Sequence, residues 1–173
     1  FAPDAGYVSD PQLSCHNLQR GAEANGAEFW FGAQVVSIDR ADGRVAGVTL
    51  ADGRSPRAKV VVNVAGPHSY IINEMAGVYE SMNIKTVCDE REYVDPDDYD
   101  QTINAEQWEV QMLRANRRLP ALGMPHEKKG IVDLYDVSDD WIPIYDRTDL
   151  DGFYVAIGTS GNQYKNAGSA AQM

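Results

Sequence analysis

The amino-acid sequence lacks the short motifs that hold phosphates or metal ions in many enzymes. G-x-G-x-x-G does not occur, and neither does any G-x-G, a Walker pattern or H-E-x-x-H. The phosphate-cradling turn of a dinucleotide-binding unit is therefore absent from these residues. The three histidines, His16, His68 and His126, are scattered along the chain without metal-ligand spacing. We expect no metal site.

Cysteine is nearly absent as well. Cys15 and Cys88 are the two cysteines among 173 residues, and they form no C-x-x-C pair. This usage is typical of a reduced cytoplasmic protein, because disulfides persist mainly in oxidising compartments. We expect two free thiols and a cytoplasmic location.

Basic residues are few, and long apolar runs are missing. Lysine and arginine total 15 against 26 aspartates and glutamates, which gives a formal charge of −11. So acidic a chain is repelled by nucleic acids and by anionic membranes. The longest apolar run surrounds residues 60–62, far below the roughly 20 residues that cross a bilayer. The sequence predicts a soluble protein without a membrane span, whose partner is a small molecule or a protein.

Both ends of the sequence indicate a fragment of a longer chain. The sequence begins with Phe1 in a turn that contains proline and glycine, and it stops at Met173 inside an apparent helix. The hydrophobic content of 43% still suffices for the core of one ordinary globular domain.

Helix and strand signals alternate through the first half of the chain. Ser9-Asp10-Pro11 opens a helix over about residues 10–25, which Gly26 ends. The segment after it has the pattern of a β-meander with two Asp-Gly turns, and its apolar runs are at residues 28–31, 34–38, 44–50 and 57–64. The last run is continuous, which predicts a strand buried on both faces. A helix over about residues 69–75 follows it.

Residues 87–101 are acidic and rich in turn formers. Two interpretations stay open: a solvated linker, or a place between Val87 and Asp95 where residues are missing, since a strand-like segment stops there abruptly. A helix is expected over about residues 105–118, and strands are expected in residues 130–137, 141–145 and 153–157. The chain accordingly divides into residues 1–84, 85–130 and 131–173.

The stretch from Gly152 to Gly168 carries the clearest functional pattern. Five apolar or aromatic residues, 153–157, form a strand signal that stops at Gly158-Thr159-Ser160-Gly161-Asn162. A short helix is expected over residues 163–172. The loop amides would then lie near the positive end of a helix, where an anion or an electron-rich ring edge is stabilised.

Two other candidate chemistries are weak. The Gly158–Gly161 segment places a serine between glycines but is not G-x-S-x-G, because the spacing is one residue short on its N-terminal side. Asp139 and Asp140 are adjacent, so on a strand their carboxyls point to opposite faces and would not share a proton. A turn role is the better interpretation of this pair.

The order of the patterns resembles one enzyme family. A helix, V-x-x-I, DGRVAGV and VVNVAGPHS are followed by LYDVSDDWIPIYD and GFYVAIGTSGNQYKNA. This order is similar to that of the FAD-dependent oxidoreductases that include D-amino-acid oxidase, glycine oxidase and sarcosine/dimethylglycine dehydrogenase. The likeness covers about residues 1–78 and 119–173. It implies an α/β (α+β) fold: the C-terminal part of a Rossmann-like FAD-binding domain with a β-meander, in residues 1–84 and 131–173, plus a remnant of a substrate domain.

The resemblance also implies an FAD site. Val35 and Val36 correspond to the strand that lies against the adenine, and Ala65-Gly66-Pro67 to the turn beside the diphosphate. Residues 158–164 correspond to the loop along the flavin's pyrimidine edge, with Gly158, Ser160, Gly161, Asn162, Gln163 and Tyr164 as the cofactor-binding residues. Amides at a helix N-terminus suit a reduced flavin, which is negatively charged near N1 and O2.

On the substrate side, Tyr135 stands where glycine-oxidase-like members have the arginine that clamps the substrate carboxylate. Tyr135 and Trp141 either wall a pocket for an N-methylated amine, through cation–π attraction, or are core aromatics of a sheet. The resemblance implies hydride transfer from an amine or amino acid to flavin N5, with oxygen or another carrier as electron acceptor, and no catalytic base is identified. Two alternatives remain: a flavin-free binding or structural module, and a flavoenzyme that acts on 2-hydroxy acids.

Overall fold

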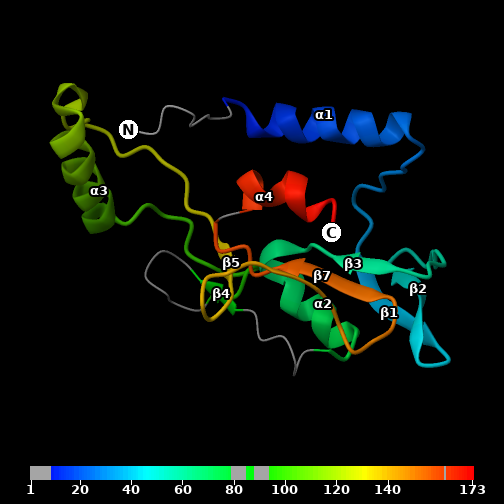
Figure 1. Cartoon of the computed structure of the whole chain (residues 1–173). Coiled ribbons are helices and arrows are strands. Elements are labelled where there is room, and N and C mark those ends of the chain that lie inside the picture. The colour runs from blue at the N-terminus through cyan, green and yellow to red at the C-terminus, as the bar shows by residue number, and fades with distance from the viewer. Residues whose placement is uncertain (1–8, 79–84, 88–93, 162) are drawn as a thin grey trace. The chain divides into compact units, whose positions relative to one another are not determined.

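The computed structural model describes residues 9–78, 85–87, 94–161 and 163–173 (Figure 1). The chain forms two compact units, residues 1–34 and 35–173. The three-part division expected from the sequence stays a prediction. The described helices are α1 (Pro11–Ala24), η1 (Gly66–His68), α2 (Ser69–Met75), α3 (Ala105–Arg118), η3 (Pro120–Leu122) and α4 (Gln163–Ala170). The described strands are β1 (Val35–Ala41), β2 (Arg44–Leu50), β3 (Val61–Asn63), β4 (Lys85–Val87), β5 (Tyr135–Val137), β6 (Ile144–Arg147) and β7 (Phe153–Ile157).

Strands β1 and β2 form an antiparallel hairpin, as the Asp-Gly signal predicts. Asp42 and Gly43 both have positive φ at its turn, which matches the right-handed twist of the two strands. The third strand of the predicted meander is confirmed only in part. Backbone hydrogen bonds join Val48 to Pro56 and Ala58 to Ala46, and Arg57 bridges Gly47, but the chain then leaves the hairpin and β3 joins another sheet. The expected strand at residues 28–31 is wrong, since that segment is irregular.

The second sheet has the strand order β3-β7-β6. Strands β3 and β7 run parallel, with Val61 opposite Phe153 and Asn63 opposite Val155, and β6 runs antiparallel to β7. Figure 1 shows β3 and β7 side by side although about 90 residues separate them in the sequence. Helix α2 contacts β3 and β1.

The core of residues 35–173 lies where β7, the hairpin and α2 meet. Phe153 and Ile157 are fully buried, and they share one cluster with six other buried residues, among them Ile38 and Val45; Ile72 of α2 packs against this cluster. Alternate residues of a strand point to opposite faces, so Phe153, Val155 and Ile157 form the buried face of β7. This packing fixes the direction in which β7 leaves the core.

The burial that the sequence predicts for strand β3 is also wrong. Its apolar run predicts burial on both faces, but Val60, Val62 and Val64 are 53, 52 and 64% exposed. Val61 packs against the core and Asn63 is buried. The run is therefore one buried face and one exposed apolar face, to which Tyr154 of β7 also contributes as the partner of Val62.

Strands β4 and β5 form a separate antiparallel pair in which Thr86 faces Asp136. Figure 1 draws this pair beside the end of β7. The predicted break between Val87 and Asp95 falls mainly on residues 88–93, which lie outside the described residues. Helix α3 has the predicted bounds, and the side chain of Asn104 caps it by accepting hydrogen bonds from the amides of Glu106 and Gln107.

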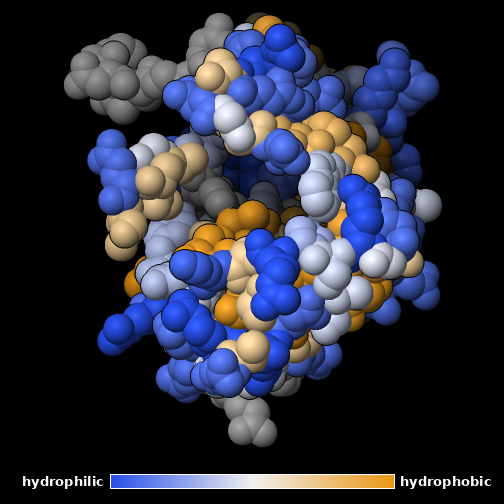
Figure 2. Space-filling view, turned by 90° about the vertical axis from the view of Figure 1, so that its right-hand side faces the viewer, coloured by the Kyte–Doolittle hydropathy of each residue, from blue (hydrophilic) through white to orange (hydrophobic). Residues whose placement is uncertain are grey.

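The face shown in Figure 2 carries many hydrophilic side chains, in keeping with the charge of −11. Apolar side chains are exposed between the charged residues, among them Leu113 and Leu119 at 52 and 61%. In the described part of the chain, every helix is too short or too polar to cross a membrane.

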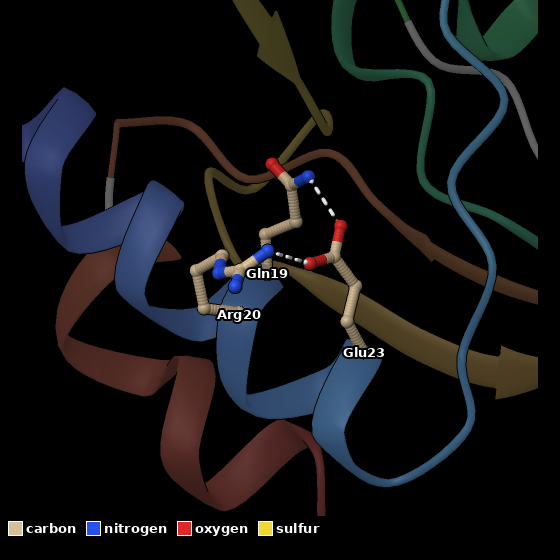
Figure 3. A network of polar contacts seen from close by, with 3 residues as sticks. All are labelled: Gln19, Arg20 and Glu23. Carbon is tan, nitrogen blue, oxygen red and sulfur yellow. Dashed lines mark hydrogen bonds and ion pairs between the residues drawn. The ribbon is translucent and has the colours of Figure 1, made fainter.

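The unit of residues 1–34 contains helix α1. The carboxylate of Asp10 accepts the amide of Leu13 at 2.8 Å, and Pro11 occupies the first turn, as the sequence predicts. Figure 3 shows Glu23 held from two sides: Gln19 Nε2 lies 2.8 Å from Oε1, and Arg20 Nη1 lies 2.9 Å from Oε2. Such contacts three and four residues apart stabilise a helix by a few tenths of a kcal/mol each, about 0.2–0.5.

Candidate functional site

Strand β7 ends in a tight turn formed by residues 158–161, at the position that the sequence predicts. Three of its four residues have positive φ: Gly158 at 63°, Ser160 at 51° and Gly161 at 72°. Glycine adopts this conformation freely, whereas serine adopts it rarely. The Ser160 hydroxyl donates to the Gly158 carbonyl at 3.0 Å, which helps to hold the unusual backbone.

Strand β5 runs alongside this turn and is joined to it by a β-bridge and two hydrogen bonds. Val137 forms an antiparallel bridge with Thr159. The Ser160 amide donates to the Asp136 carbonyl at 2.8 Å, and the Thr159 hydroxyl donates to Asp136 Oδ1 at 2.5 Å. The turn is therefore shaped from outside by β5, and the amide of Ser160 is already used within the protein.

The ring of Tyr135, at the start of β5, lies against Gly161. A Cβ placed on Gly161 would be 3.0 Å from Cε1 of that ring. The structure therefore brings together a residue predicted for the substrate pocket and a residue predicted for the cofactor loop. Tyr135 is 45% exposed, so it is not a buried core aromatic.

We expect Gly161→Ala to destabilise the turn. The substitution forces alanine into positive φ, at a cost of about 1 kcal/mol, and it also displaces the Tyr135 ring. Gly168→Ala is the matched control, because a Cβ at Gly168 in α4 meets nothing within 4 Å, and alanine is the better helix former. Urea unfolding of the full-length protein should show a lower midpoint for Gly161→Ala only; equal midpoints for the two variants would contradict both the positive φ of Gly161 and its contact with Tyr135.

The second predicted turn, Ala65-Gly66-Pro67, is held by a buried amide. Asn63 is 3% exposed at the end of β3. Its Nδ2 donates to the Ser69 carbonyl and to Asn73 Oδ1, both at 2.9 Å, and its Oδ1 accepts the Ala65 amide at 3.1 Å. One side chain thus ties the strand, the turn and helix α2 together.

The two turns lie at the same edge of the sheet. Because β3 and β7 are parallel and in register, their carboxyl ends point the same way, and ligands of α/β sheets bind outside such ends. Helix η1, which contains Gly66 and Pro67, also contacts β5. We define the edge site as the residues 65–67, Tyr135 and 158–161.

One side-chain contact between η1 and a distant carboxylate borders the edge site. Nε2 of His68 lies 2.9 Å from Oδ1 of Asp97. It links η1 to the acidic segment that follows residue 93. Among the described residues, no group of three histidine, cysteine, aspartate or glutamate side chains has a geometry that would hold a metal ion.

The remaining predicted site residues lie outside the edge site, some in another sheet and some directly after the turn of residues 158–161. Val35 and Val36 are at the start of β1, in the hairpin sheet. Gln163 begins α4 two residues after Gly161, and Tyr164 is 57% exposed. Asn162 lies outside the described residues. Trp141 is 39% exposed with φ of 63°, in the segment before β6.

Asp140 has the turn role that the sequence favours. Its Oδ1 accepts the amide of Ile142 and lies 3.0 Å from the Ser138 hydroxyl. These hydrogen bonds stabilise the charged form and lower the pKa of the carboxyl, the Ile142 amide having the larger effect. Asp140 therefore stays ionised and fixes the segment between β5 and β6.

Sequence reasoning missed Asn63, Asp136 and Thr159, the side chains that hold the edge site. A signal for Asn63 was present: a lone polar residue interrupts the apolar run VVNVA, and a buried amide needs partners. For Asp136 the signal was weaker, because an aspartate in a short strand is indistinguishable in sequence from one that faces solvent.

Comparisons with known proteins concern the family and the fold of the chain. A family model described as FAD dependent oxidoreductase matches residues 1–88. No curated protein matches the chain. The fold is similar to that of L-proline dehydrogenase from P. horikoshii, with a TM-score of 0.81 at 19% identity over 95% of this chain and 54% of the other.

Two further solved structures have the same fold at low identity. Glycine oxidase from Bacillus cereus ATCC 14579 gives a TM-score of 0.68 at 17% identity, covering 88% of this chain and 51% of its own. Iminodiacetate oxidase from Chelativorans sp. BNC1 gives 0.61 at 17% identity, covering 86% and 50%. The chain thus spans about half the length of the structures that it matches.

Proposed function

The chain belongs to the FAD-dependent oxidoreductase family, and from that premise we propose that it is part of an enzyme that oxidises the C–N bond of an amine or amino acid. The observation that carries the proposal is the edge site. Two backbone turns from parallel strands and an aromatic side chain meet at one carboxyl edge, which is where cofactors bind in α/β sheets.

The described residues fit part of an FAD molecule. No side chain projects from Gly66 or Gly161, and a Cβ on Gly66 would meet nothing within 4 Å, so a planar or phosphorylated group has room to approach the backbone. In the proposal, Ala65, Gly66 and Pro67 hold the diphosphate side, and Gly158, Ser160, Gly161 and the start of α4 hold the flavin's pyrimidine edge. Bound FAD would supply the two-electron acceptor. The G-x-G-x-x-G fingerprint does not occur in these 173 residues.

The backbone turn of residues 158–161 has two tasks in this proposal. It excludes side chains from the flavin edge, and it presents fixed dipoles where negative charge develops on reduction. Val35 and Val36 stay predicted contacts of the adenine through their position in β1.

Tyr135 and Trp141 form the proposed substrate side. Both are partly exposed, at 45 and 39%, and Tyr135 adjoins the turn. An aromatic face attracts a protonated amine by cation–π interaction, worth about 0.5–2 kcal/mol. The similar structures are an L-proline dehydrogenase, a glycine oxidase and an iminodiacetate oxidase. Proline, glycine and iminodiacetate are all small α-amino acids, and we propose a substrate of this class.

We expect the purified full-length protein to carry FAD, visible as flavin absorbance bands. Under anaerobic conditions these bands should bleach on addition of a primary, secondary or tertiary amino acid, because hydride transfer reduces the flavin. Sarcosine, dimethylglycine, glycine, proline and a D-amino acid form the test panel, and a 2-hydroxy acid is the matched control. Oxygen uptake, compared with reduction of an artificial dye, then distinguishes oxidase from dehydrogenase activity.

Each negative result points to one alternative. Bleaching by the 2-hydroxy acid alone would replace the amine with a hydroxy-acid substrate. A full-length protein that binds no FAD, even when FAD is added, would overturn the enzyme proposal and leave a flavin-free binding or structural module.

A further inference from the structure

Asp136 is a buried carboxyl that the proposed chemistry leaves without a role. It is 3% exposed in the middle of β5. Its Oδ1 accepts the Thr159 hydroxyl, while its Oδ2 is buried without a hydrogen-bond partner in the described structure. Burying a carboxyl with one oxygen unpaired costs stability, so this residue type at this position calls for a functional explanation.

The residues around Asp136 exclude the simplest role, that of a catalytic base. Oδ1 is engaged at 2.5 Å, and the side chain lies beneath the turn with almost no exposed surface. A catalytic base must reach a proton of the substrate. Asp136 instead contacts the turn that faces the proposed cofactor.

The turn needs an external support. Residues 158–161 contain two glycines and have three positive φ angles, and such a segment has many conformations of similar energy when it is unsupported. Asp136 restrains it at two consecutive residues, through the Thr159 hydroxyl and the Ser160 amide. Because Tyr135 precedes Asp136 and touches Gly161, the same strand positions the proposed substrate wall.

We propose that Asp136 is a positioning residue: through its hydrogen bond to Thr159 it fixes the turn of residues 158–161 in the conformation that receives the flavin, and so couples FAD binding to the placement of Tyr135. This inference rests on the proposed function only for the identity of the ligand. Preorganised backbone raises affinity because the entropy of ordering is lost before the ligand binds.

Thr159→Val in the full-length protein tests the proposal, because it removes the hydroxyl and conserves shape. We expect the dissociation constant for FAD to rise about tenfold, the scale of one lost hydrogen bond. Hydrogen exchange of the backbone at residues 158–161 should also accelerate in the flavin-free protein. Thr159→Ser, which restores the hydroxyl, should recover both properties.

Thr102→Val is the matched control. Thr102 also donates its hydroxyl to an aspartate, Asp100, at 2.7 Å, but the pair is exposed and remote in sequence from the edge site. It should change neither FAD affinity nor exchange at residues 158–161. Asp136→Asn completes a double-mutant cycle: its effect on FAD affinity should be smaller in the Thr159→Val background, because the shared hydrogen bond is already lost.

The outcomes separate this inference from the proposed function. Unchanged FAD affinity in Thr159→Val, failure of Thr159→Ser to rescue, or additive effects in the cycle would each overturn the positioning role. A wild-type protein that binds FAD and ranks the variants as expected, yet oxidises no amine, would support the positioning role and overturn the proposed substrate class. A wild-type protein without FAD affinity would overturn both.

Discussion

Gly152→Ala should lower the stability of the protein by about 3 kcal/mol, the combined cost of a strained backbone and an overpacked contact. Gly152 has φ of 82° at the turn before β7. A Cβ there would collide with the carbonyl oxygen of Lys59, which belongs to the backbone and has little freedom to move. The carbonyl of Gly152 also accepts the amide of Val61 at 2.9 Å, so the collision separates β7 from β3 at their first hydrogen bond.

The consequence should extend to the edge site. Strands β3 and β7 supply the two turns, and their parallel register determines how the turns face each other. We therefore expect Gly152→Ala to weaken FAD binding as well as to lower the midpoint of urea unfolding.

Gly53→Ala is the matched control, because it measures the cost of backbone strain without a steric collision. Gly53 has nearly the same φ, 87°, but a Cβ there meets nothing within 4 Å. Its cost should be about 1 kcal/mol, that of backbone strain alone. If the two variants unfold at the same urea concentration, the close approach of Lys59 to Gly152 is absent in solution.

Local signals made much of the secondary structure predictable. The helices at residues 11–24, 69–75 and 105–118 begin at Asp10-Pro11, after Gly66-Pro67 and at Asn104, all of which are start signals that act within a few residues. The hairpin follows from Asp42-Gly43 for the same reason. Strand β7 and its glycine-rich end were equally readable.

Pairing between distant segments was not predictable from local patterns. The run at residues 57–64 continues the meander in sequence, yet β3 pairs with β7, because hydrogen bonding of a strand depends on which segment the tertiary fold brings beside it. The exposed face of Val60, Val62 and Val64 shows the same limit. A continuous apolar run in the sequence shows that the segment is apolar, but it does not show whether one face or both faces of the strand are buried.

The backbone turns of the candidate site were predictable from the sequence, but the side chains that hold those turns were not. Both turns carry glycines, which mark positive φ in the sequence. The side chains that hold the turns act across gaps in the chain, 23 residues between Asp136 and Thr159 and 10 residues between Asn63 and Asn73. Such partners are defined only once the sheet has formed.

Asn63→Asp should have the largest effect on the turn of residues 65–67, the proposed diphosphate side of the site. The substitution conserves shape and keeps an acceptor for the Ala65 amide, but it removes both hydrogen bonds that Nδ2 donates. It also places a carboxylate against two acceptor oxygens, those of Ser69 and Asn73, at a position 3% exposed. Leaving a buried charge without a partner costs about 3–5 kcal/mol, so we expect a loss of this size in the free energy of unfolding at neutral pH.

Burial and the facing oxygens raise the pKa of the new carboxyl in the folded state. The instability should therefore shrink as pH falls from the raised pKa of the folded state to the ordinary range for aspartate, where the protonated carboxyl again donates one hydrogen bond, and it should be complete above the raised pKa. Urea unfolding at several pH values measures this dependence. Asn104→Asp is the matched control, because Asn104 only accepts, from the amides of Glu106 and Gln107 at a helix N-terminus, where a carboxylate is favourable. Comparable losses in the two variants would show that Asn63 does not act as a buried donor, and would remove the support for the turn of residues 65–67.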